Sequence, residues 1–321
     1  MITPNFSFQF KKIGVSLSLE KVDFKMAFFI HVVAPLISIG ICATNDICTL
    51  PPLLARINSF SGFYEVIIVT SGVSDEMIGV VDEFMEKCWH RVIHIVEKKR
   101  RGKWYALNMI FGVFSGDYLI LLPADVWINE DSILQLVHRL QDMPDLGVVS
   151  GFPLAHPRSL GAMGLLWRLH GAALRVNGNF NSHATGELLA MKRALAHPLP
   201  PKTINDDAFL ARRAILRGWR VGVVPSAKVI IRVPNSIRGY IWQRERILLG
   251  HRQLRSMGDK STTLKGMISV SPRKASRLIL SELHSIKDLL NLAMLVFLEL
   301  FLMVLILRRR TTEYSIWRRI E

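Results

Sequence analysis

Short apolar runs alternate with longer segments of helical spacing between residues 36 and 122, and this alternation constrains the fold more than any other feature of the chain. The apolar runs predict buried strands and the longer segments predict helices. We expect strands over 36–43, 65–72, 91–98 and 118–122, and helices over 75–88 and 104–114. Strand and helix in alternation indicate an α/β fold with a mainly parallel sheet and helices on both faces.

Polar residues follow several of these predicted strands. Thr44, Asn45 and Asp46 follow the first strand, Ser71 ends the second, and Asp125 follows the fourth in the segment "GDYLILLPADV". Parallel α/β sheets bind ligands at the carboxyl ends of their strands. The sequence therefore predicts that these side chains meet along one edge of the sheet, where a ligand binds.

The composition is that of a basic globular protein. Half of the 321 residues are hydrophobic, which is enough for a substantial core and excludes a disordered chain. The net charge of +15 and the pI near 10.1 indicate an anionic partner, which is a nucleic acid, an acidic membrane surface or a phosphorylated substrate. Three irregularly spaced cysteines favour a reducing compartment over a disulfide framework or zinc site.

A nineteen-residue apolar run, "LLNLAMLVFLELFLMVLIL", covers residues 289–307 and is long enough to cross a bilayer as a helix. Three arginines at 308–310 follow it directly, which is a common flank at a membrane edge. Glu299 argues against a span, because an ionised acid in a bilayer is costly unless it is protonated or paired. The alternative is an apolar helix that packs on the soluble domain or on a partner subunit.

The segment upstream of this run is basic and amphipathic. Ser271 and Pro272 are a helix-start signal, and the arginines and lysine that follow stand beside Leu278, Ile279 and Leu280. This pattern suits a helix on an anionic membrane surface. Residues 26–43 are more typical of a lead-in and a strand than of a span, and no cleavable signal peptide is evident. The predicted organisation is an N-terminal extension (1–34), a globular domain (35–258), a basic interfacial linker or helix (259–288), a transmembrane helix (289–307) and a basic tail (308–321).

Six short segments between about Pro35 and Leu254 occur in the order of a known family's motifs. They are "CATND", "TSGVSD", "RGKWYALN", "PAD", "NDDAFLARRAILRGWRVGVVPSA" and "QRERI". In this series the chain resembles the family 2 glycosyltransferases, which are inverting enzymes with a GT-A fold and include cellulose, chitin and hyaluronan synthases and dolichyl-phosphate sugar transferases. The resemblance implies a GT-A fold with a C-terminal membrane-associated helical segment, and a nucleotide-sugar donor that is UDP-linked.

The first four motifs imply the donor site. By their register Asn45, Ser71 and Lys103 contact the donor, and Asp125 holds the donor through a metal, Mg²⁺ or Mn²⁺. One or two carboxylates can hold such a cation because diphosphate oxygens and waters complete its octahedron. The chain departs from the family at Ser71, where an acid often stands, and at Pro123, which replaces the first acid of the Asp-x-Asp motif.

The fifth motif implies the catalytic base. Its register assigns Asp207 to that role, with Asp206 as an acidic neighbour on the acceptor or diphosphate side. Inversion displaces the leaving group at the anomeric carbon, so the acceptor hydroxyl must lose its proton as it attacks. Repulsion between adjacent carboxylates can raise one pKa toward a useful range. Both residues are also suited to starting a helix, and Gly218 is suited to ending it.

The sixth motif implies an arginine beside the leaving group. Arg246 contacts the diphosphate by this register, and Gln243 lies on the same side. A guanidinium can form a bidentate contact as charge develops on the departing diphosphate. Ile247 replaces the family's tryptophan, which removes a face on which a sugar could stack.

These observations lead to one functional hypothesis and two rivals. We expect a membrane-associated glycosyltransferase whose catalytic domain is cytoplasmic and whose acceptor is lipid-linked or a glycan. One rival is a non-catalytic GT-A domain that binds a nucleotide or a partner protein. The other is a nucleic-acid binder, which the basic run at 98–103 does not support, because it has no interleaved aromatic residues or recognisable motif.

Overall fold

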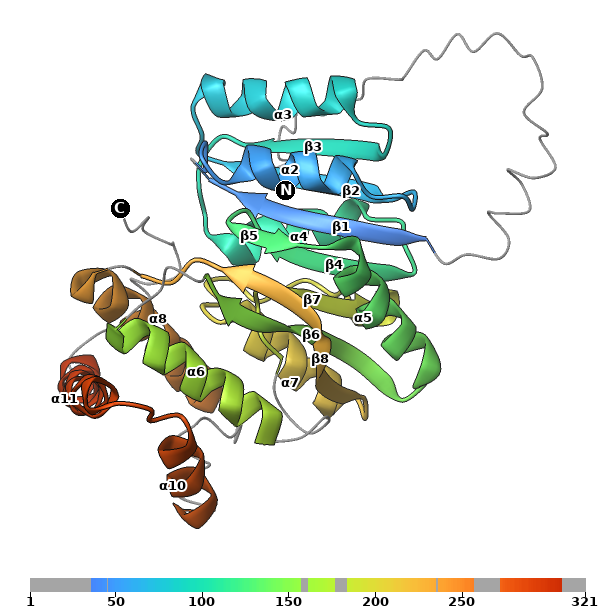
Figure 1. Ribbon diagram of the computed structural model, residues 1–321. Helices are drawn as coiled ribbons and strands as arrows, with labels where there is room; N and C mark the ends of the chain where they lie inside the picture. The colour runs from blue at the N-terminus through green and yellow to red at the C-terminus, as the bar shows by residue number, and fades with distance from the viewer. Residues whose placement is uncertain are drawn as a thin grey trace, which may run out of the picture.

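The computed structural model describes residues 36–44, 46–156, 161–176, 184–234, 236–256 and 272–307. Eight strands form one sheet in the order β3-β2-β1-β4-β7-β6-β8-β5 (Figure 1). The strands are β1 (Ile37–Ala43), β2 (Glu65–Ser71), β3 (Arg91–Glu97), β4 (Tyr118–Pro123), β5 (Val126–Ile128), β6 (Leu146–Ala155), β7 (Leu189–Lys192) and β8 (Arg220–Ile231). The four strands predicted from the sequence agree with β1 to β4 to within one residue at each end.

The helices flank the sheet and continue beyond it. They are α2 (Leu50–Asn58), α3 (Asp75–Lys87), α4 (Lys103–Val113), α5 (Glu130–Asp142), α6 (Gly161–Val176), α7 (Asp206–Leu216), α8 (Ile237–Ser256), α10 (Pro272–Ser281) and α11 (Ile286–Leu307), with a 3₁₀ turn η1 (Arg193–Leu195). The predicted helices match α3 and α4. Helix α2 was missed, although prolines in its first turn are compatible with a helix start.

The sheet mixes parallel and antiparallel pairs. Strands β3, β2, β1 and β4 are parallel neighbours, and β6 is parallel to β8. Strand β7 runs antiparallel to both β4 and β6, and β5 runs antiparallel to β8. Because Leu121 near the end of β4 pairs with Leu189 at the start of β7, the residues just before β7 reach the carboxyl edge of β4. The first half therefore has the predicted parallel order, while β7 reverses it.

Two hydrophobic cores lie on the two faces of the sheet. Successive side chains of a strand point to opposite faces, so Val66 and Ile68 join the core under α2, α3 and α5, whereas Ile67 and Val69 join the core under α4 and α7. Burial on both faces explains why these strands read as continuous apolar runs in the sequence.

A third hydrophobic cluster joins α6, α8, α10 and α11. Figure 1 shows these helices together beyond the part of the sheet that contains β6 and β8. Helix α11 is long and apolar enough to cross a membrane by length and composition, and it begins three residues earlier than predicted. One face of α11 also packs against α6 and α8. This face agrees with the alternative interpretation, in which the apolar helix packs on the domain.

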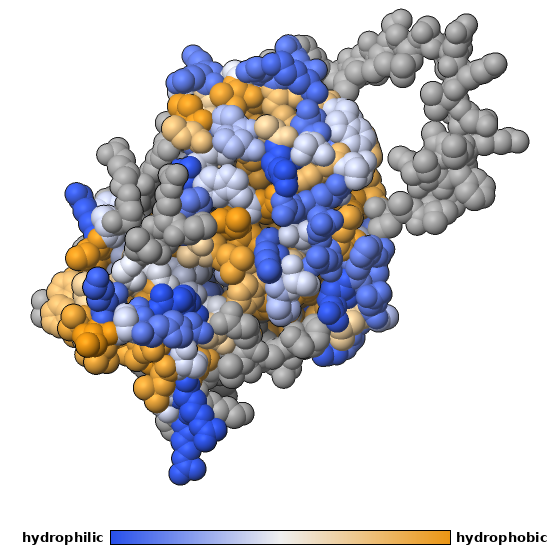
Figure 2. Space-filling model, in the orientation of Figure 1, coloured by the Kyte–Doolittle hydropathy of each residue, from blue (hydrophilic) through white to orange (hydrophobic). Residues whose placement is uncertain are grey.

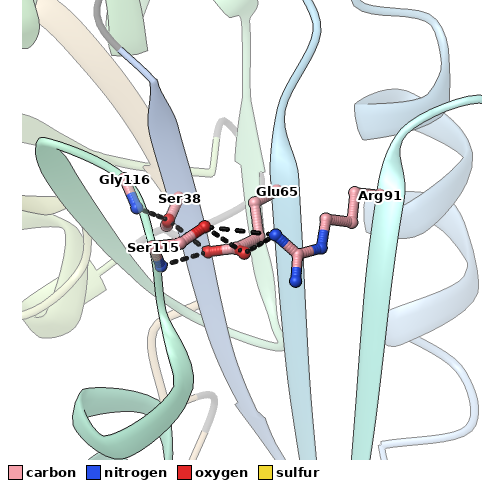
Figure 3. Close-up of polar contacts among 5 residues, drawn as sticks. All are labelled: Ser38, Glu65, Arg91, Ser115 and Gly116. Atoms are coloured by element: carbon pink, nitrogen blue, oxygen red, sulfur yellow. Dashed lines mark hydrogen bonds and ion pairs between the residues drawn. The ribbon is translucent and has the colours of Figure 1, made fainter. Parts of the chain in front are cut away.

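The amino-terminal edge of the sheet is held by a buried glutamate (Figure 3). Glu65 accepts hydrogen bonds from the Ser38 hydroxyl at 2.6 Å and from the Ser115 hydroxyl at 2.6 Å and backbone N–H at 2.7 Å. The Arg91 guanidinium lies 3.1 Å from the same carboxylate, and the Gly116 N–H donates to the Ser38 hydroxyl. These contacts tie β1, β2, β3 and the loop before β4 together at the edge opposite the strand ends that carry the predicted site.

Candidate active site

The carboxyl ends of β1 to β4 form one edge, as the sequence predicted. The register pairs Cys42 with Pro123 and Ser71 with Glu97, so the loops that follow these strands start side by side. Ser71 is buried, and its hydroxyl donates a hydrogen bond of 2.6 Å to the Glu97 carboxylate. Glu97 thus supplies, from β3, a carboxylate beside the position where the family often has an acid on β2.

A buried ion pair lies at the start of α4. The Lys103 ammonium is 2.7 Å from the Asp206 carboxylate, although the two residues are far apart in the sequence. Burial alone lowers the pKa of Lys103, but the attraction and hydrogen bond from Asp206 outweigh it, so the pKa is raised. Lys103 remains a cation at neutral pH and also interacts electrostatically with Asp207. The pair fixes the start of α7 against the edge of the parallel strands.

Asp207 lies beside the segment that precedes β7. A Cβ atom on Gly186 would be 3.3 Å from the Asp207 carboxylate, so the missing side chain at 186 leaves room for Asp207. Glu187 follows, and its Oε2 atom is buried with no hydrogen-bond partner among the described residues. Burial raises the pKa of Glu187 to about 7, and repulsion from Asp207 adds to the rise. Three carboxylates, at positions 187, 206 and 207, therefore gather where the fifth motif begins.

Arg246 on α8 balances these carboxylates. Burial lowers its pKa to about 10, and the three carboxylates oppose the decrease, so the side chain is charged at neutral pH. Gln243 lies one turn earlier on the same helix and is half-buried. Asp206 and Asp207 were predicted from one motif and Arg246 from another, and the fold brings the three within electrostatic range of one another.

The contact between α8 and the start of α7 explains the glycine of the sixth motif. A Cβ atom on Gly250 would be 2.3 Å from the Asn205 side chain, so only glycine allows this close approach. The Asn205 amide donates to the Ile247 carbonyl at 3.1 Å, and Gln253 bonds to the backbone N–H of Ile204 and the carbonyl of Lys202. Asn205 precedes α7 but does not cap it with its side chain. Its amide instead fixes Asp206 and Asp207 relative to Arg246.

Asp125 lies at the same edge, just after the end of β4. Its side chain is exposed at the surface, yet the surrounding protein removes enough water to raise its pKa, and repulsion from Asp46 raises it further. Lys103 and Arg232 oppose this rise. Lys103 thus interacts electrostatically with both predicted carboxylates, Asp125 and Asp207.

Asp46 and Asp125 together could contribute to a metal site. Carboxylate oxygens suit Mg²⁺ or Mn²⁺, and a cation between two repelling acids lowers the cost of ionising both. Among the residues that the structure describes, no three His, Cys, Asp or Glu side chains group as a metal-binding set. A cation held by this pair would need its remaining ligands from other groups, such as diphosphate oxygens and water.

The sequence-predicted residues divide into three groups. Lys103, Asp206, Asp207 and Arg246 form one charged cluster, to which Asp125 is linked through Lys103. Ser71 lies farther along the edge with its hydroxyl bonded to Glu97, and Asn45 lies outside the described residues.

Sequence reasoning missed Glu187. The segment "TGELLAMKR" was recognised as resembling a family segment, but its acid received no role. The available signal was a lone glutamate directly before a short apolar strand, and its meaning depends on the antiparallel direction of β7.

Comparison with known proteins identifies a family over the first part of the described domain. Residues 38–189 match the family described as "Glycosyl transferase family 2". This range includes β1 except for its first residue, the Lys103 helix and Asp125, and it ends at the first residue of β7.

Residues 38–189 form a family 2 glycosyltransferase domain.

Curated relatives of this chain include the poly-β-1,6-N-acetyl-D-glucosamine synthases of Staphylococcus aureus (strain COL) and Staphylococcus epidermidis. Each is 25% identical over 206 residues, which cover 59% of this chain and 48% of the relative. The chain thus spans about half the length of the curated relatives it matches. Among solved structures, a mannosyltransferase from Pyrobaculum calidifontis in complex with GDP-Man and Mn²⁺ superposes with a TM-score of 0.59 at 19% identity, covering 88% of this chain and 86% of the other. This similarity identifies the fold as GT-A.

Proposed function

We propose that this family 2 chain transfers a sugar from a nucleotide-sugar donor to a lipid-linked or glycan acceptor, with inversion at the anomeric carbon. The observation that carries the proposal is the charged cluster in which Lys103 pairs with Asp206 at 2.7 Å and interacts electrostatically with Asp125 and Asp207, while Arg246 interacts with Asp206 and Asp207. A cluster of charges from separate elements, most of them partly or fully buried, is costly to assemble, which is expected at a functional site.

Each residue has a role in the proposed reaction. Asp207 accepts the proton of the acceptor hydroxyl as the new bond to the anomeric carbon forms and the bond to the diphosphate oxygen breaks. Arg246 stabilises the negative charge that develops on the departing diphosphate. Asp206 holds Lys103 at the start of α4, and Gln243 contributes to the same side of the site.

We further propose that Asp125 and Asp46 hold Mg²⁺ or Mn²⁺ when the donor is bound. The cation would neutralise part of the diphosphate charge. The rise that the Asp46 carboxylate causes in the pKa of Asp125 supports this assignment.

A donor screen tests the activity. Detergent-extracted protein would be incubated with UDP- and GDP-linked sugars, with and without Mn²⁺, and nucleotide release would be measured. UDP-N-acetylglucosamine is the first donor to test, because the curated relatives are named as synthases of an N-acetylglucosamine polymer. We expect divalent-dependent release from at least one donor. Nucleotide binding without release from any donor would contradict the proposal and favour a non-catalytic GT-A domain.

A binding measurement tests the metal assignment separately. We expect Asp46→Asn to weaken Mn²⁺ binding in the presence of UDP about tenfold, as measured by calorimetry. Asp142→Asn, which changes an exposed acid at the end of α5, is the matched control and should leave Mn²⁺ binding unchanged. Equal binding by all three proteins would remove Asp46 from the site.

We also propose that the protein works at a membrane, with the catalytic domain on the cytoplasmic side where nucleotide sugars are made. The apolar helix α11 and the excess of basic residues support this location.

A further inference from the structure

One face of helix α11 is packed on the domain at the start, middle and end of the helix. Near its start, Asp288 is 2.7 Å from Arg168 of α6. Its middle contributes Leu295, Leu298 and Leu302 to the cluster with α6 and α8. At its end, the Ile306 carbonyl accepts a hydrogen bond from Arg252 of α8. The domain therefore accompanies the helix from its first turn to its last.

Glu299, the residue that argued against a span, is paired with α8. Its carboxylate accepts two hydrogen bonds from the Arg244 guanidinium, at 2.5 and 2.8 Å, and one of 2.6 Å from the Tyr240 hydroxyl. Arg244 stands two positions before Arg246, so the two arginines project from different sides of α8. One side of α8 holds the active-site acids and another side holds α11.

A helix perpendicular to the bilayer would carry these contacts into the hydrocarbon. Residues 288–306 extend over about 27 Å, close to the thickness of the bilayer core. Arg168 of α6 contacts α11 near its start, and Arg244 and Arg252 of α8 contact it near its middle and end. If α11 crossed the bilayer, at least one of these arginines, together with the helix that carries it, would lie deep in the membrane. Charged side chains at that depth are costly. The packing of α11 on α6 and α8 therefore disfavours a transmembrane orientation.

The opposite side of α11 is an exposed apolar face. Its members, all more than a third exposed, are Leu289, Leu290, Met294, Val296, Phe297, Leu300, Phe301, Met303 and Val304. Figure 2 shows hydrophobic atoms gathered at the lower left, where Figure 1 places α11. A continuous apolar face of this size requires a covering surface.

The charges around this face indicate which surface covers it. On α10, Arg273 and Arg277 are exposed beside the strongly exposed Leu280, and Figure 2 shows hydrophilic atoms below the apolar region at the position of α10. The sequence continues from α11 directly into three arginines, and the chain has a net charge of +15. Basic residues beside an apolar helix face complement anionic headgroups above an acyl layer.

We propose that α11 lies in the plane of an anionic membrane surface, with its exposed apolar face inserted at the headgroup boundary, and that it does not cross the bilayer. The Arg244–Glu299 pair then joins the membrane-bound helix to the helix that carries Arg246. This inference differs from the single span expected from the sequence, and it does not depend on the proposed catalytic activity.

Vesicle binding tests the partner. We expect the full chain to co-sediment with vesicles of phosphatidylcholine that contain phosphatidylglycerol, and more weakly with phosphatidylcholine alone or at high salt. Phe297→Glu combined with Leu300→Glu should reduce binding at least about tenfold, because two large apolar side chains leave the interface. The matched control, Leu216→Glu, changes a 70% exposed leucine on α7 and should bind as the unaltered protein does. If the protein bound neither kind of vesicle and formed a dimer through this face, the proposal would be overturned, and the face would be covered by a second copy of the chain.

Depth measurements test the orientation. Spin labels would be placed by Leu290→Cys, Phe297→Cys and Val304→Cys in a Cys48→Ser background, since Cys48 is exposed. A helix in the membrane plane places all three labels at a similar shallow depth on the side of the added protein. A spanning helix places the label at 297 deepest and those at 290 and 304 near opposite surfaces, which would overturn the proposal.

Discussion

Two glutamates at opposite edges of the sheet differ in their hydrogen bonding. Glu65, at the amino-terminal edge, accepts three hydrogen bonds and pairs with Arg91. Glu187, at the carboxyl edge, has one buried oxygen with no hydrogen-bond partner among the described residues, and its pKa is raised to about 7. Both carboxylates lie among buried strand ends, so burial alone does not separate them.

The difference indicates what each edge does. A buried carboxylate with all its hydrogen bonds satisfied stabilises the elements it joins, whereas one left incompletely satisfied costs stability. Such a cost is expected where groups must be available to a substrate. We therefore infer that the amino-terminal edge serves the fold, and that the carboxyl edge serves the proposed reaction. Four substitutions test this contrast.

The largest effect is expected for Asp207→Asn. Removal of the proposed base should lower the rate of sugar transfer by about 10²- to 10⁴-fold, because the acceptor hydroxyl loses its proton acceptor. The measurement is turnover under donor saturation, with UDP binding and the thermal midpoint as controls for folding. Unchanged turnover in a folded, UDP-binding variant would exclude Asp207 as the base and direct attention to Glu187.

Glu65→Ala should affect stability instead. Loss of the carboxylate leaves Ser38 and the Ser115 N–H without their acceptor at a buried position, and we expect a decrease of about 3 to 5 kcal/mol in the free energy of unfolding. Urea denaturation measures this, and turnover per folded molecule should stay the same. The control is Glu83→Ala, which removes an exposed partner of Lys87 and should not shift the urea midpoint. If the two variants had comparable urea midpoints, Glu65 would not stabilise the amino-terminal edge as inferred.

Glu187→Gln should stabilise the protein, and only at higher pH. The pKa of this acid rises from 4.5 to about 7 on folding, so the folded state favours the protonated form. Ionisation above pH 4.5 therefore costs stability, and this cost grows until the pH exceeds 7. We expect glutamine to add between about 1 and 3 kcal/mol at pH 8 and almost nothing at pH 4. Urea curves at the two pH values measure the difference, and an equal effect at both would show that ionisation is not the cause.

The smallest effect is expected for Ser71→Ala. The variant removes one hydrogen bond to the Glu97 carboxylate and should cost about 1.5 kcal/mol of stability. If Ser71 also contacts the donor, the dissociation constant for UDP should rise by less than about tenfold. Ser71→Thr keeps the hydroxyl and is the control. A loss of UDP binding much larger than this in the alanine variant would assign the residue chiefly to the nucleotide.

The sequence predicted the parallel half of the sheet well. Strands β1 to β4 are buried on both faces and therefore appear as continuous apolar runs, and the residues that follow them meet at one edge as expected. Helix α2 was missed because its prolines were not recognised as the first turn of a helix.

The candidate site was predicted in part. Lys103, Asp206, Asp207 and Arg246 were each assigned from a short motif, and the fold places them in one cluster. Glu187 was not predicted because sequence reasoning looked for site residues after parallel strands. Glu187 instead precedes β7, and it reaches the same edge because β7 is antiparallel to β4.

The sequence by itself determined the α/β pattern, the chemical types of the site residues and the presence of a long apolar helix, because these depend on local periodicity and residue identity. Tertiary structure decided that β7 is antiparallel to β4, which brings Glu187 to the carboxyl edge of the sheet. It also decided that Asn205 packs closely against Gly250 and that Glu299 pairs with Arg244. These outcomes depend on contacts between residues from 45 to 68 positions apart, whose energies are absent from any local stretch of the chain.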